Sequence, residues 1–340
     1  LFFDFCPSQR IIGITGTKGK GTTASLIHHI LKIANKQSWL GGNIGVAPFD
    51  FLEEIKKTDW LVLELSSFQL EDIMASPHIG LITNFSKEHL APADPLNPNY
   101  HKSLQQYWLA KFSLAKWQSD NDYLIVNEKL AQRIKKYSLP GKLIFFRKSD
   151  LPSQLVGEHN QENIGAAAAV AKIIKIKPGT IKRAVASFPG LEHRLEPVKE
   201  IKGIKCFNDT FATTPEAAIT ALKAFSFKSA KDLQIILIAG GADKGSDFKN
   251  LAREIKKQIK LLVLLSGPGT ERLKKQLKAA NYPQERIKEF KNMNSAVKQA
   301  WQAAEPGNVI LLAPGCASFG LFKNYKQRGQ LFKEAVRQLK

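Results

Sequence analysis

Short apolar runs rich in Ile, Val and Leu alternate along this 340-residue chain with longer stretches of helical character. The strand candidates are Ile11–Thr15, Trp60–Leu65, Ile79–Thr83, Tyr123–Val126, Leu143–Phe146, Lys205–Asn208, Leu233–Ala239, Lys260–Leu265, Ile287–Phe290 and Asn308–Leu312. The helix candidates include Thr22–Ala34, Ser103–Trp117, Asn160–Ile174, Pro215–Ala224, Phe248–Lys257 and Ser295–Ala304. Alternation of strands with helices is typical of parallel sheets covered by helices. The sequence therefore predicts an α/β fold with doubly wound sheets.

The strand candidates fall into two groups. Helical segments and the turn-forming sequence Phe188-Pro189-Gly190-Leu191 separate the strand at Leu143–Phe146 from the strand at Lys205–Asn208. A length of 340 residues also suits two domains better than one. We expect a first domain over residues 1–190 and a second over residues 191–340.

Composition narrows the class of protein. The formal net charge is +20, as in many nucleic-acid-binding proteins, but the lysines are spread along helical segments such as Glu254–Gln258, which is typical of solvated helix faces. No zinc-finger spacing and no aromatic RNA-binding signature occurs, so we expect no nucleic-acid partner. The three cysteines lie far apart, and no apolar run is long enough to span a membrane. We expect a cytoplasmic protein that binds no membrane.

A glycine-rich segment follows the first strand candidate. It reads Gly16-Thr17-Lys18-Gly19-Lys20-Gly21-Thr22-Thr23 and leads into a helical run. Glycines let backbone N–H groups face a phosphate, and the helix N-terminus adds positive potential. Lys20 is placed to reach the β- and γ-phosphates of a nucleotide. Because Gly21 follows it, Thr22 becomes the hydroxyl candidate for Mg²⁺, and Ile14 stands where a leading glycine is usual.

Two further features suit a nucleotide site. Glu64 ends a strand candidate, and the carboxyl ends of parallel strands form the crevice where such sheets bind ligands; it is a candidate Mg²⁺ ligand or else a surface acid. Asn160 and Asn163 lie an i, i+3 step apart, so both amides face one side of a helix and are candidates to bind adenine. Helix capping is the alternative role for Asn160.

The glycine-rich segment resembles the phosphate loop of the Mur ligase superfamily, which includes folylpolyglutamate synthetase. Other blocks resemble the D-glutamate-adding members in particular, and they occur in family order over essentially the whole chain. These blocks are Gly41–Gly45, Leu63–Glu71, Gly157–Asn160 with Asn163, Pro189–Arg194, Asn208–Thr210, Ala212–Thr213, Pro215–Ala217, Gly240–Gly241 with Lys244, Cys316–Phe319, Asn324–Tyr325 and Arg328–Gly329.

The resemblance implies a phosphate-loop central domain, a Rossmann-like C-terminal domain and a monomeric ATP-dependent ligase. Such an enzyme phosphorylates a carboxylate with ATP, and an amine then attacks the acyl phosphate. The D-glutamate-adding members join D-glutamate to UDP-N-acetylmuramoyl-L-alanine in peptidoglycan precursor synthesis. The implied cofactors are ATP and Mg²⁺, together with a carbamylated lysine at Lys111.

The resemblance also assigns roles to single residues. It gives Lys20, Glu64, His89 and Lys111 catalytic roles, and it makes Thr22, Glu64, His89 and Lys111 metal ligands, although a salt-bridging helix lysine is the alternative for Lys111. It places Arg194 at the ATP phosphates and Asp209 at the ribose, so that domain closure completes the ATP site. The expected substrate-binding residues are Asn43, Ser66, Gln69, Thr213, Lys244, Ser318 and Tyr325, with a solvated loop lysine as the alternative for Lys244 and a helix cap for Ser318.

The sequence departs from the family pattern at three places. Phe211 stands where many relatives carry lysine, which removes an expected cation from the amino-acid site. The proline-rich stretch Ala91–Asn99 replaces an Asp that usually follows His-Leu. The chain also starts almost at the phosphate-loop strand, and we therefore hypothesise weak binding of the UDP substrate by this chain alone.

Two alternatives stay open at this point. Gly21 after Lys20 favours another ligase of the superfamily, such as folylpolyglutamate synthetase, whereas the Leu63–Gln69 and Cys316–Phe319 blocks favour the D-glutamate-adding members. The net charge also suits a non-catalytic ATP-binding or nucleic-acid-binding module.

Overall fold

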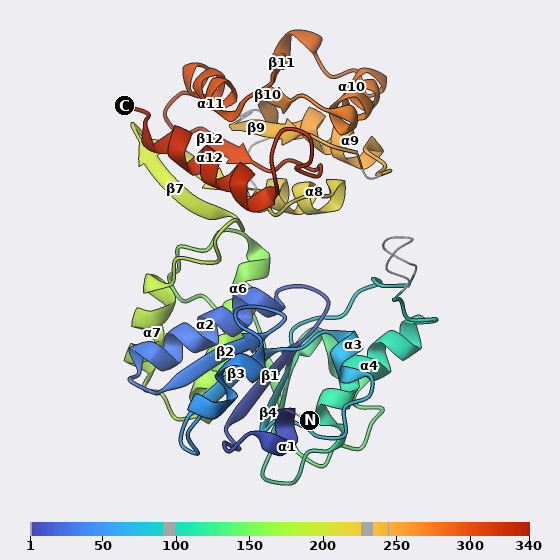
Figure 1. Ribbon diagram of the computed structural model, residues 1–340, viewed down its shortest axis with the longest axis vertical. Coiled ribbons are helices and arrows are strands. Elements are labelled where there is room, and N and C mark those ends of the chain that lie inside the picture. The colour runs from blue at the N-terminus through green and yellow to red at the C-terminus, as the bar shows by residue number, and fades with distance from the viewer. Residues whose placement is uncertain (1, 91–98, 226–233, 244) are drawn as a thin grey trace. The chain divides into compact units, whose positions relative to one another are not determined.

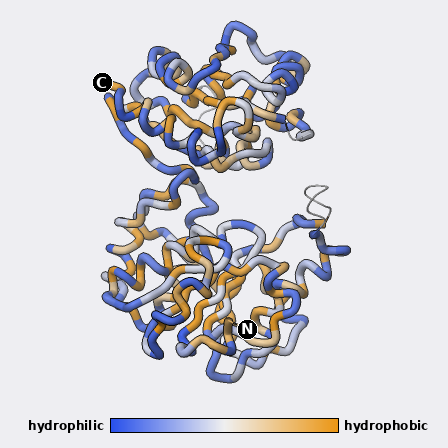
Figure 2. Tube along the Cα trace, viewed as in Figure 1, coloured by the Kyte–Doolittle hydropathy of each residue, from blue (hydrophilic) through white to orange (hydrophobic). Residues whose placement is uncertain are grey.

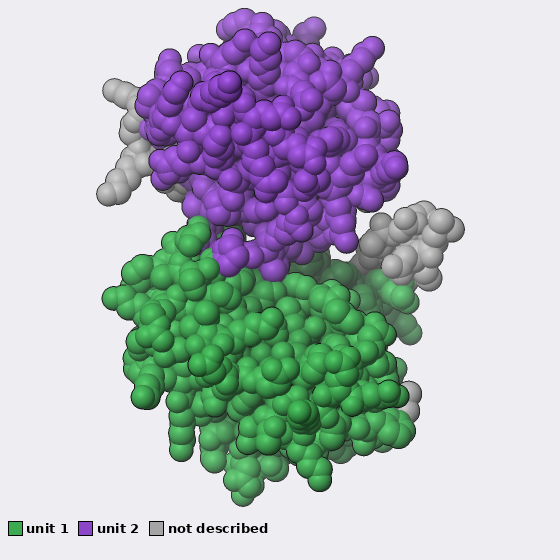
Figure 3. All heavy atoms as spheres, turned by 60° about the vertical axis from the view of Figure 1, so that its left-hand side comes forward, with its two compact units in different colours: residues 1–154, 158–188 green, residues 155–157, 189–340 purple. Residues whose placement is uncertain are grey.

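The computed structural model describes residues 2–90, 99–225, 234–243 and 245–340. The chain divides into two compact units (Figure 3): unit 1 is Leu1–Gln154 with Glu158–Phe188, and unit 2 is Leu155–Gly157 with Pro189–Lys340. Leu233 of one predicted strand, the stretch 91–98 and the candidate residue Lys244 lie outside the described residues.

Unit 1 is built on a sheet of six strands within the described residues (Figure 1). They are β1 (Ile11–Thr15), β2 (Ser38–Gly42), β3 (Trp60–Glu64), β4 (Ile79–Ile82), β5 (Tyr123–Asn127) and β6 (Lys142–Phe146). The α-helices are α1 (Phe2–Phe5), α2 (Lys20–Ile33), α3 (Ser67–Leu70), α4 (Leu104–Lys116), α5 (Ala131–Ile134), α6 (Glu158–Ile173) and α7 (Pro178–Ser187). Two short 3₁₀ turns are η1 (Pro48–Glu54) and η2 (Glu128–Leu130).

The strands of unit 1 run parallel in the order β2-β3-β1-β4-β5-β6. Strands β1 and β3 are buried along their whole length, as expected for central strands covered on both faces. Helix α2 packs against α6 and α7, and α4 packs against α3, β1 and β4. Strands β2 and β3 lie on one side of β1, and β4 to β6 lie on the other, so the strand order reverses direction at β1. Parallel sheets bind ligands at the carboxyl ends of the strands where this reversal occurs.

Unit 2 also contains a six-stranded sheet within the described residues. Its strands are β7 (Glu196–Ile201), β8 (Ile204–Asn208), β9 (Ile235–Gly240), β10 (Ile259–Leu265), β11 (Ile287–Phe290) and β12 (Val309–Leu312), in the order β11-β10-β9-β12-β8-β7. The helices are α8 (Pro215–Lys223), α9 (Lys249–Gln258), α10 (Pro268–Ala279), α11 (Met293–Gln302) and α12 (Tyr325–Arg337), with a 3₁₀ turn η3 (Gln284–Arg286).

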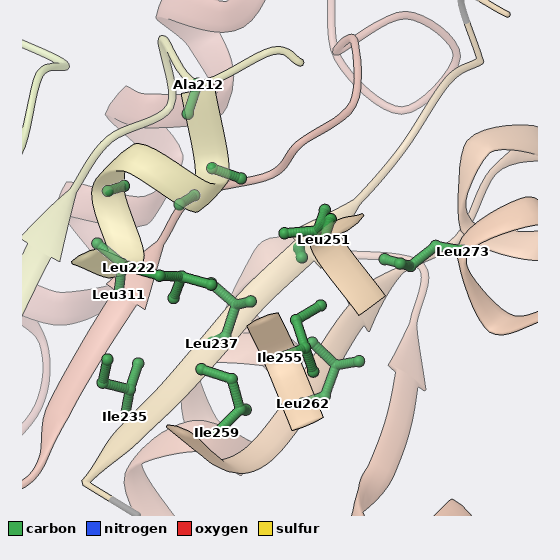
Figure 4. Packing of buried hydrophobic residues seen from close by; sticks show 14 of the residues in the cluster. Ala212, Leu222, Ile235, Leu237, Leu251, Ile255, Ile259, Leu262, Leu273 and Leu311 are labelled. Atoms are coloured by element: carbon green, nitrogen blue, oxygen red, sulfur yellow. The ribbon is translucent and has the colours of Figure 1, made fainter. Parts of the chain in front are cut away.

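Alternate residues of β9 point to opposite faces of the second sheet. Ile235 and Leu237 belong to a core packed by α8, α9 and α10 (Figure 4), whereas Ile236 and Ile238 belong to a second core packed by α11 and α12. Because side chains of a strand alternate, a strand buried on both faces must be apolar throughout, and Figure 2 shows hydrophobic residues gathered inside each unit. This pattern confirms the predicted α/β class with helices on both faces.

Two edge strands were not predicted. Strand β2 contains Gly41 and Gly42, and β7 mixes charged residues with Pro197, so neither has the apolar run that identified the central strands. Strand β7 is moreover antiparallel to β8, which corrects the expectation of purely parallel sheets. Helices α10 and α12 were also absent from the list of predicted helices. None of the described helices is both long enough and apolar enough to cross a membrane.

Candidate active site

The phosphate loop lies between the buried strand β1 and helix α2. Gly16 has φ +146°, and a Cβ at this position would lie 2.0 Å from Thr83 Oγ1; Gly19 has φ +81°, and its Cβ would lie 2.3 Å from Asn163 Oδ1. Only glycine therefore fits at either position. Gly19 is the N-cap residue of α2 and offers no side-chain cap, so the first N–H groups of the helix face the loop.

The loop is held by residues that follow β4. Asn84 accepts hydrogen bonds from the backbone N–H groups of Thr17 (3.1 Å, at its carbonyl) and Lys18 (2.8 Å, at Oδ1), and its Nδ2 donates to the Lys18 carbonyl (2.9 Å). Thr83 Oγ1 donates to the same carbonyl (2.8 Å). Thr83 and Asn84 were not identified as site residues from the sequence, because no local pattern predicts that β4 pairs with β1.

Two lysines meet at this loop. Lys20 Nζ donates to the carbonyls of Gly16 and Thr17, each at 3.1 Å, and Lys111 Nζ donates to the Gly16 carbonyl at 2.9 Å. Lys111 is 1% exposed, and burial together with the positive charge of Lys20 lowers its pKa to about 7. A buried amine with such a pKa is neutral in a large fraction of molecules at pH 7.

Tyr107 links Lys111 to the loop. Its hydroxyl donates to Thr17 Oγ1 (3.3 Å), and Lys111 Nζ lies 4.4 Å from the centre of its ring. Burial raises the pKa of Tyr107 to about 12, so its hydroxyl stays protonated. The i, i+4 spacing of Tyr107 and Lys111 on α4 is the sequence signal that identifies this pair.

Glu64 ends β3 beside the loop. It pairs with Ile14 of β1 in the sheet register, its carbonyl accepts from Asn43 N (2.9 Å), and the residue is 8% exposed. Glu64 therefore ends its strand beside the strand that leads into the loop contacted by Lys20 and Lys111.

His89 lies near this edge in a left-handed backbone conformation, with φ +56°. Its ring meets Phe68 and Tyr107 edge to face, at centroid distances of 5.5 and 5.7 Å. Partial burial is the main cause that lowers the pKa of His89. The negative charge of Glu88 raises this pKa, and the positive charges of Lys111 and Lys20 lower it further.

His101 was not identified from the sequence. It is buried, stacks on Phe68 at 4.7 Å and shares a 2.9 Å hydrogen bond with Ser67, and its backbone N–H donates to the His89 carbonyl (2.8 Å). His101 thus helps to fix the backbone of His89.

The two asparagines of α6 face the helix that follows the loop. Asn163 Nδ2 donates to Asn160 Oδ1 (2.9 Å), and Asn163 Oδ1 accepts from Thr23 Oγ1 (3.3 Å). Asn160 is the third residue of α6, so it does not cap that helix. The hydroxyl of Thr23 is engaged by Asn163, which leaves Thr22 as the loop hydroxyl on the first turn of α2.

Ser66 and Gln69 follow Glu64 and form a capping box at α3. Ser66 Oγ accepts from Gln69 N (3.2 Å), and Gln69 Oε1 accepts from Ser66 N (2.8 Å). The Ser-x-x-Gln spacing is the sequence signal for this motif. A substrate contact would therefore use the Gln69 amide N–H groups or the Ser66 hydroxyl hydrogen.

In unit 2 the candidate residues gather at the carboxyl ends of β8 and β12, which are neighbours in the sheet. Asp209 follows β8, and its Oδ1 accepts from Leu195 N (3.1 Å); burial raises its pKa to about 7, against the lowering effect of Arg194. Ser318 is 5% exposed in the segment after β12. The hydroxyl of Thr210 donates to the carbonyl of Tyr325 (3.1 Å), so the start of α12 is tied to the segment after β8.

Arg328 also connects these segments and was not identified as a site residue. It is fully buried and donates to the carbonyls of Thr210 (2.9 Å) and Cys316 (3.1 Å) and to Thr210 Oγ1 (2.9 Å). The segments after β8 and β12 are therefore fixed to each other through one guanidinium. Thr213 lies in the first of them, where its backbone N–H donates to the Phe211 carbonyl (2.8 Å).

Comparison with known proteins finds a family match for each unit. Residues 14–146 match the Mur ligase middle domain, and residues 193–316 match the glutamate ligase domain of Mur ligases. The chain is 35% identical to the UDP-N-acetylmuramoylalanine–D-glutamate ligase of Acetivibrio thermocellus and 37% identical to that of Clostridium tetani. Each alignment covers 99% of this chain and 76% of the relative.

Solved structures share the fold. The MurF ligase of Thermotoga maritima in complex with ADP has a TM-score of 0.69 at 17% identity, covering 97% of this chain and 81% of that chain. MurC of the same organism gives 0.69 at 18% identity, covering 98% and 77%.

The fold and the two matched domains define the class: a two-unit α/β enzyme of the Mur ligase type, with a glycine-rich loop after the first strand of its first sheet. The sequence identity to the two bacterial ligases over 99% of this chain then shows the family to which it belongs. The chain belongs to the Mur ligase family, and it is an ATP-dependent ligase.

Proposed function

We propose that the chain adds D-glutamate to UDP-N-acetylmuramoyl-L-alanine, with ATP as the second substrate, in peptidoglycan precursor synthesis. The relatives from Acetivibrio thermocellus and Clostridium tetani, 35% and 37% identical, are UDP-N-acetylmuramoylalanine–D-glutamate ligases. Their identity supports the same substrates for this chain. The observation that carries the proposal is that Lys20 and Lys111 both donate to the loop after β1, while Glu64 ends the neighbouring strand β3.

The first step joins two anions, so the site must supply positive charge and fixed donors. A carboxylate oxygen of the UDP substrate attacks the γ-phosphorus of ATP, the bond to the β,γ-bridging oxygen breaks, and ADP leaves. Lys20 and the first N–H groups of α2 are the groups of this chain that offset the phosphate charge. The amine of the amino acid then attacks the acyl carbon and phosphate leaves.

Mg²⁺ fits the oxygen donors of this edge. The Glu64 carboxylate and the Thr22 hydroxyl are the hard ligands that Mg²⁺ prefers, and the ion would neutralise charge on the transferred phosphate. Within the described residues no three His, Cys, Asp or Glu side chains gather as a metal site. A bound Mg²⁺ would therefore take further oxygens from ATP.

Lys111 as an amine is a donor, and it becomes a metal ligand only if it is carbamylated. Carbamate formation requires the neutral amine, and the pKa of Lys111 near 7 together with its burial supports that modification. His89 would be a further metal ligand and would support a second Mg²⁺, as the family resemblance implies.

Unit 2 would bind the amino acid and part of ATP. We assign Arg194 and Asp209 to the nucleotide, and Thr213, Ser318 and Tyr325 to the two carboxylates of D-glutamate, with Lys244 as the matching cation. The grouping of Asp209, Thr213 and Ser318 after neighbouring strands supports this assignment. The cytoplasmic location and the monomeric state stay predictions.

An amino-acid panel tests the proposal. ADP release is measured with UDP-N-acetylmuramoyl-L-alanine and D-glutamate, L-glutamate, D-aspartate or meso-diaminopimelate, and separately with a folate and L-glutamate. We expect release that depends on D-glutamate. Release with the folate alone would identify the alternative ligase. No release with any pair, at UDP-substrate concentrations high enough to offset weak binding, would support a non-catalytic nucleotide-binding module.

A further inference from the structure

Phe211 is an exposed aromatic residue with a guanidinium over its face. The Arg194 Cζ atom lies 3.7 Å from the centre of the Phe211 ring, and Phe211 is 40% exposed. The ring of Tyr325 meets the Phe211 ring edge to face at 5.3 Å and 85°. What distinguishes Phe211 from other exposed phenylalanines such as Phe145 is that its ring contacts a cation on one side and an aromatic ring on another, and both contacts are attractive.

The backbone on both sides of this contact is tied down. Phe211 N donates to the His193 carbonyl (3.2 Å), and Leu195 N donates to Asp209 Oδ1 (3.1 Å). His193 and Leu195 both adopt positive φ, 67° and 42°, which fixes the direction in which Arg194 leaves the chain. At the other end of the side chain, the guanidinium lies over the Phe211 ring.

We propose that Phe211 is a positioning residue that holds the Arg194 guanidinium for the nucleotide phosphates. This inference rests on the proposed function, which places Arg194 at ATP. A long arginine side chain loses rotamer freedom when it binds phosphate, and a ring that already holds the guanidinium reduces that loss. Many relatives carry a lysine at the position of Phe211, and that charge would repel Arg194. In this chain the aromatic ring of Phe211 attracts the Arg194 guanidinium instead.

Nucleotide binding by the full chain tests this inference. ADP affinity is measured by isothermal titration for the wild type, Phe211→Leu, Phe211→Trp and Arg194→Met, and for the double variant Phe211→Leu/Arg194→Met. Phe145→Leu is the matched control, because Phe145 is 39% exposed on β6 of unit 1. Thermal unfolding of each variant separates a loss of folding from a loss of contact.

We expect Phe211→Leu to weaken ADP binding by about two- to fivefold, as for an exposed cation–π contact, and Phe211→Trp to restore it. In the Arg194→Met background Phe211→Leu should have no further effect, since the ring acts through Arg194. The KM for ATP should rise in Phe211→Leu while the KM for the amino acid stays unchanged.

Three results would overturn the inference: unchanged affinity in Phe211→Leu, an equal loss in the Arg194→Met background, or a change in the amino-acid KM alone, which would make Phe211 a wall of the acceptor site. Failure of the proposed function is a separate result, because it removes amino-acid-dependent ADP release without changing the comparison of ADP affinities.

Discussion

Lys111 Nζ donates a 2.9 Å hydrogen bond to the carbonyl of Gly16, 95 positions away in the chain. This contact joins the buried face of α4 to the phosphate loop and places an amine with a pKa near 7 beside Lys20. Two lysines at one carbonyl repel each other when both are charged. The arrangement therefore favours the neutral form of the buried lysine, which is the form that chemistry at nitrogen requires.

Lys111→Ala should abolish turnover, since it removes the group that is expected to become a metal ligand. ADP release measures the effect, and Lys116→Ala on the same helix, at an exposed position, is the control. With ¹³C-bicarbonate, a carbamate signal should appear in the wild type and grow from pH 6 to pH 8, because the neutral fraction of Lys111 rises through its pKa of about 7. An acidic replacement or added bicarbonate should also change activity. Normal turnover in Lys111→Ala would refute the carbamate.

Gly19→Ala should weaken ATP binding by about tenfold, because an alanine in the left-handed region costs about 1–2 kcal/mol and its Cβ would meet Asn163. Gly179→Ala is the matched control: no atom lies within 4 Å of its Cβ position, and residue 179 is in the first turn of α7. That change should leave ATP affinity unaltered. Equal ATP affinity in both variants, measured by titration, would show that the loop conformation does not matter.

Asp209→Asn should stabilise unit 2 at high pH. The pKa of Asp209 is raised from 3.8 to about 7 by burial, so the folded state binds the proton more tightly than the unfolded state does, and stability falls as pH rises from about 4 to 7. The difference between a pKa of 3.8 and one of about 7 corresponds to about 4 kcal/mol above pH 7, and the variant avoids this cost. Calorimetric Tm values without nucleotide should agree near pH 4 and differ at pH 8.

The exposed Asp120 provides a control for that comparison, since Asp120→Asn should change Tm little at either pH. A lower Tm for Asp209→Asn at pH 8 than for the wild type would contradict the prediction. ATP affinity of the same variant tests the assignment of Asp209 to the ribose.

The central strands were predictable because burial on both faces leaves a continuous apolar run. The phosphate loop was predictable because Gly16 and Gly19 have positive φ and no room for a Cβ. The edge strand β7 was not predictable from the sequence. It pairs with a single neighbour, β8, so it can carry Pro197 and charged residues and lacks a continuous apolar run. The helix boundaries differed by a few residues at most, as for α2, which begins at Lys20 instead of Thr22.

Candidate site residues could be predicted where the chemistry requires a particular residue type. They could not be predicted where a residue contributes only through tertiary packing. Lys20 and Glu64 are candidates from their positions alone, one in a glycine-rich loop and the other at a strand end. The contacts of Asn84 with the loop and of His101 with His89 arise only when distant segments meet. Ser66 and Gln69 show that a capping signal can coincide with a family motif.

The central claim is that a carboxylate oxygen attacks the terminal phosphate of ATP at the edge formed by Lys20, Glu64 and Lys111. Transfer of ¹⁸O tests it most directly, with UDP-N-acetylmuramoyl-L-alanine labelled in the alanine carboxylate and D-glutamate as acceptor. We predict that each inorganic phosphate released carries one labelled oxygen from the carboxylate. Unlabelled phosphate released together with the amide product would contradict the account.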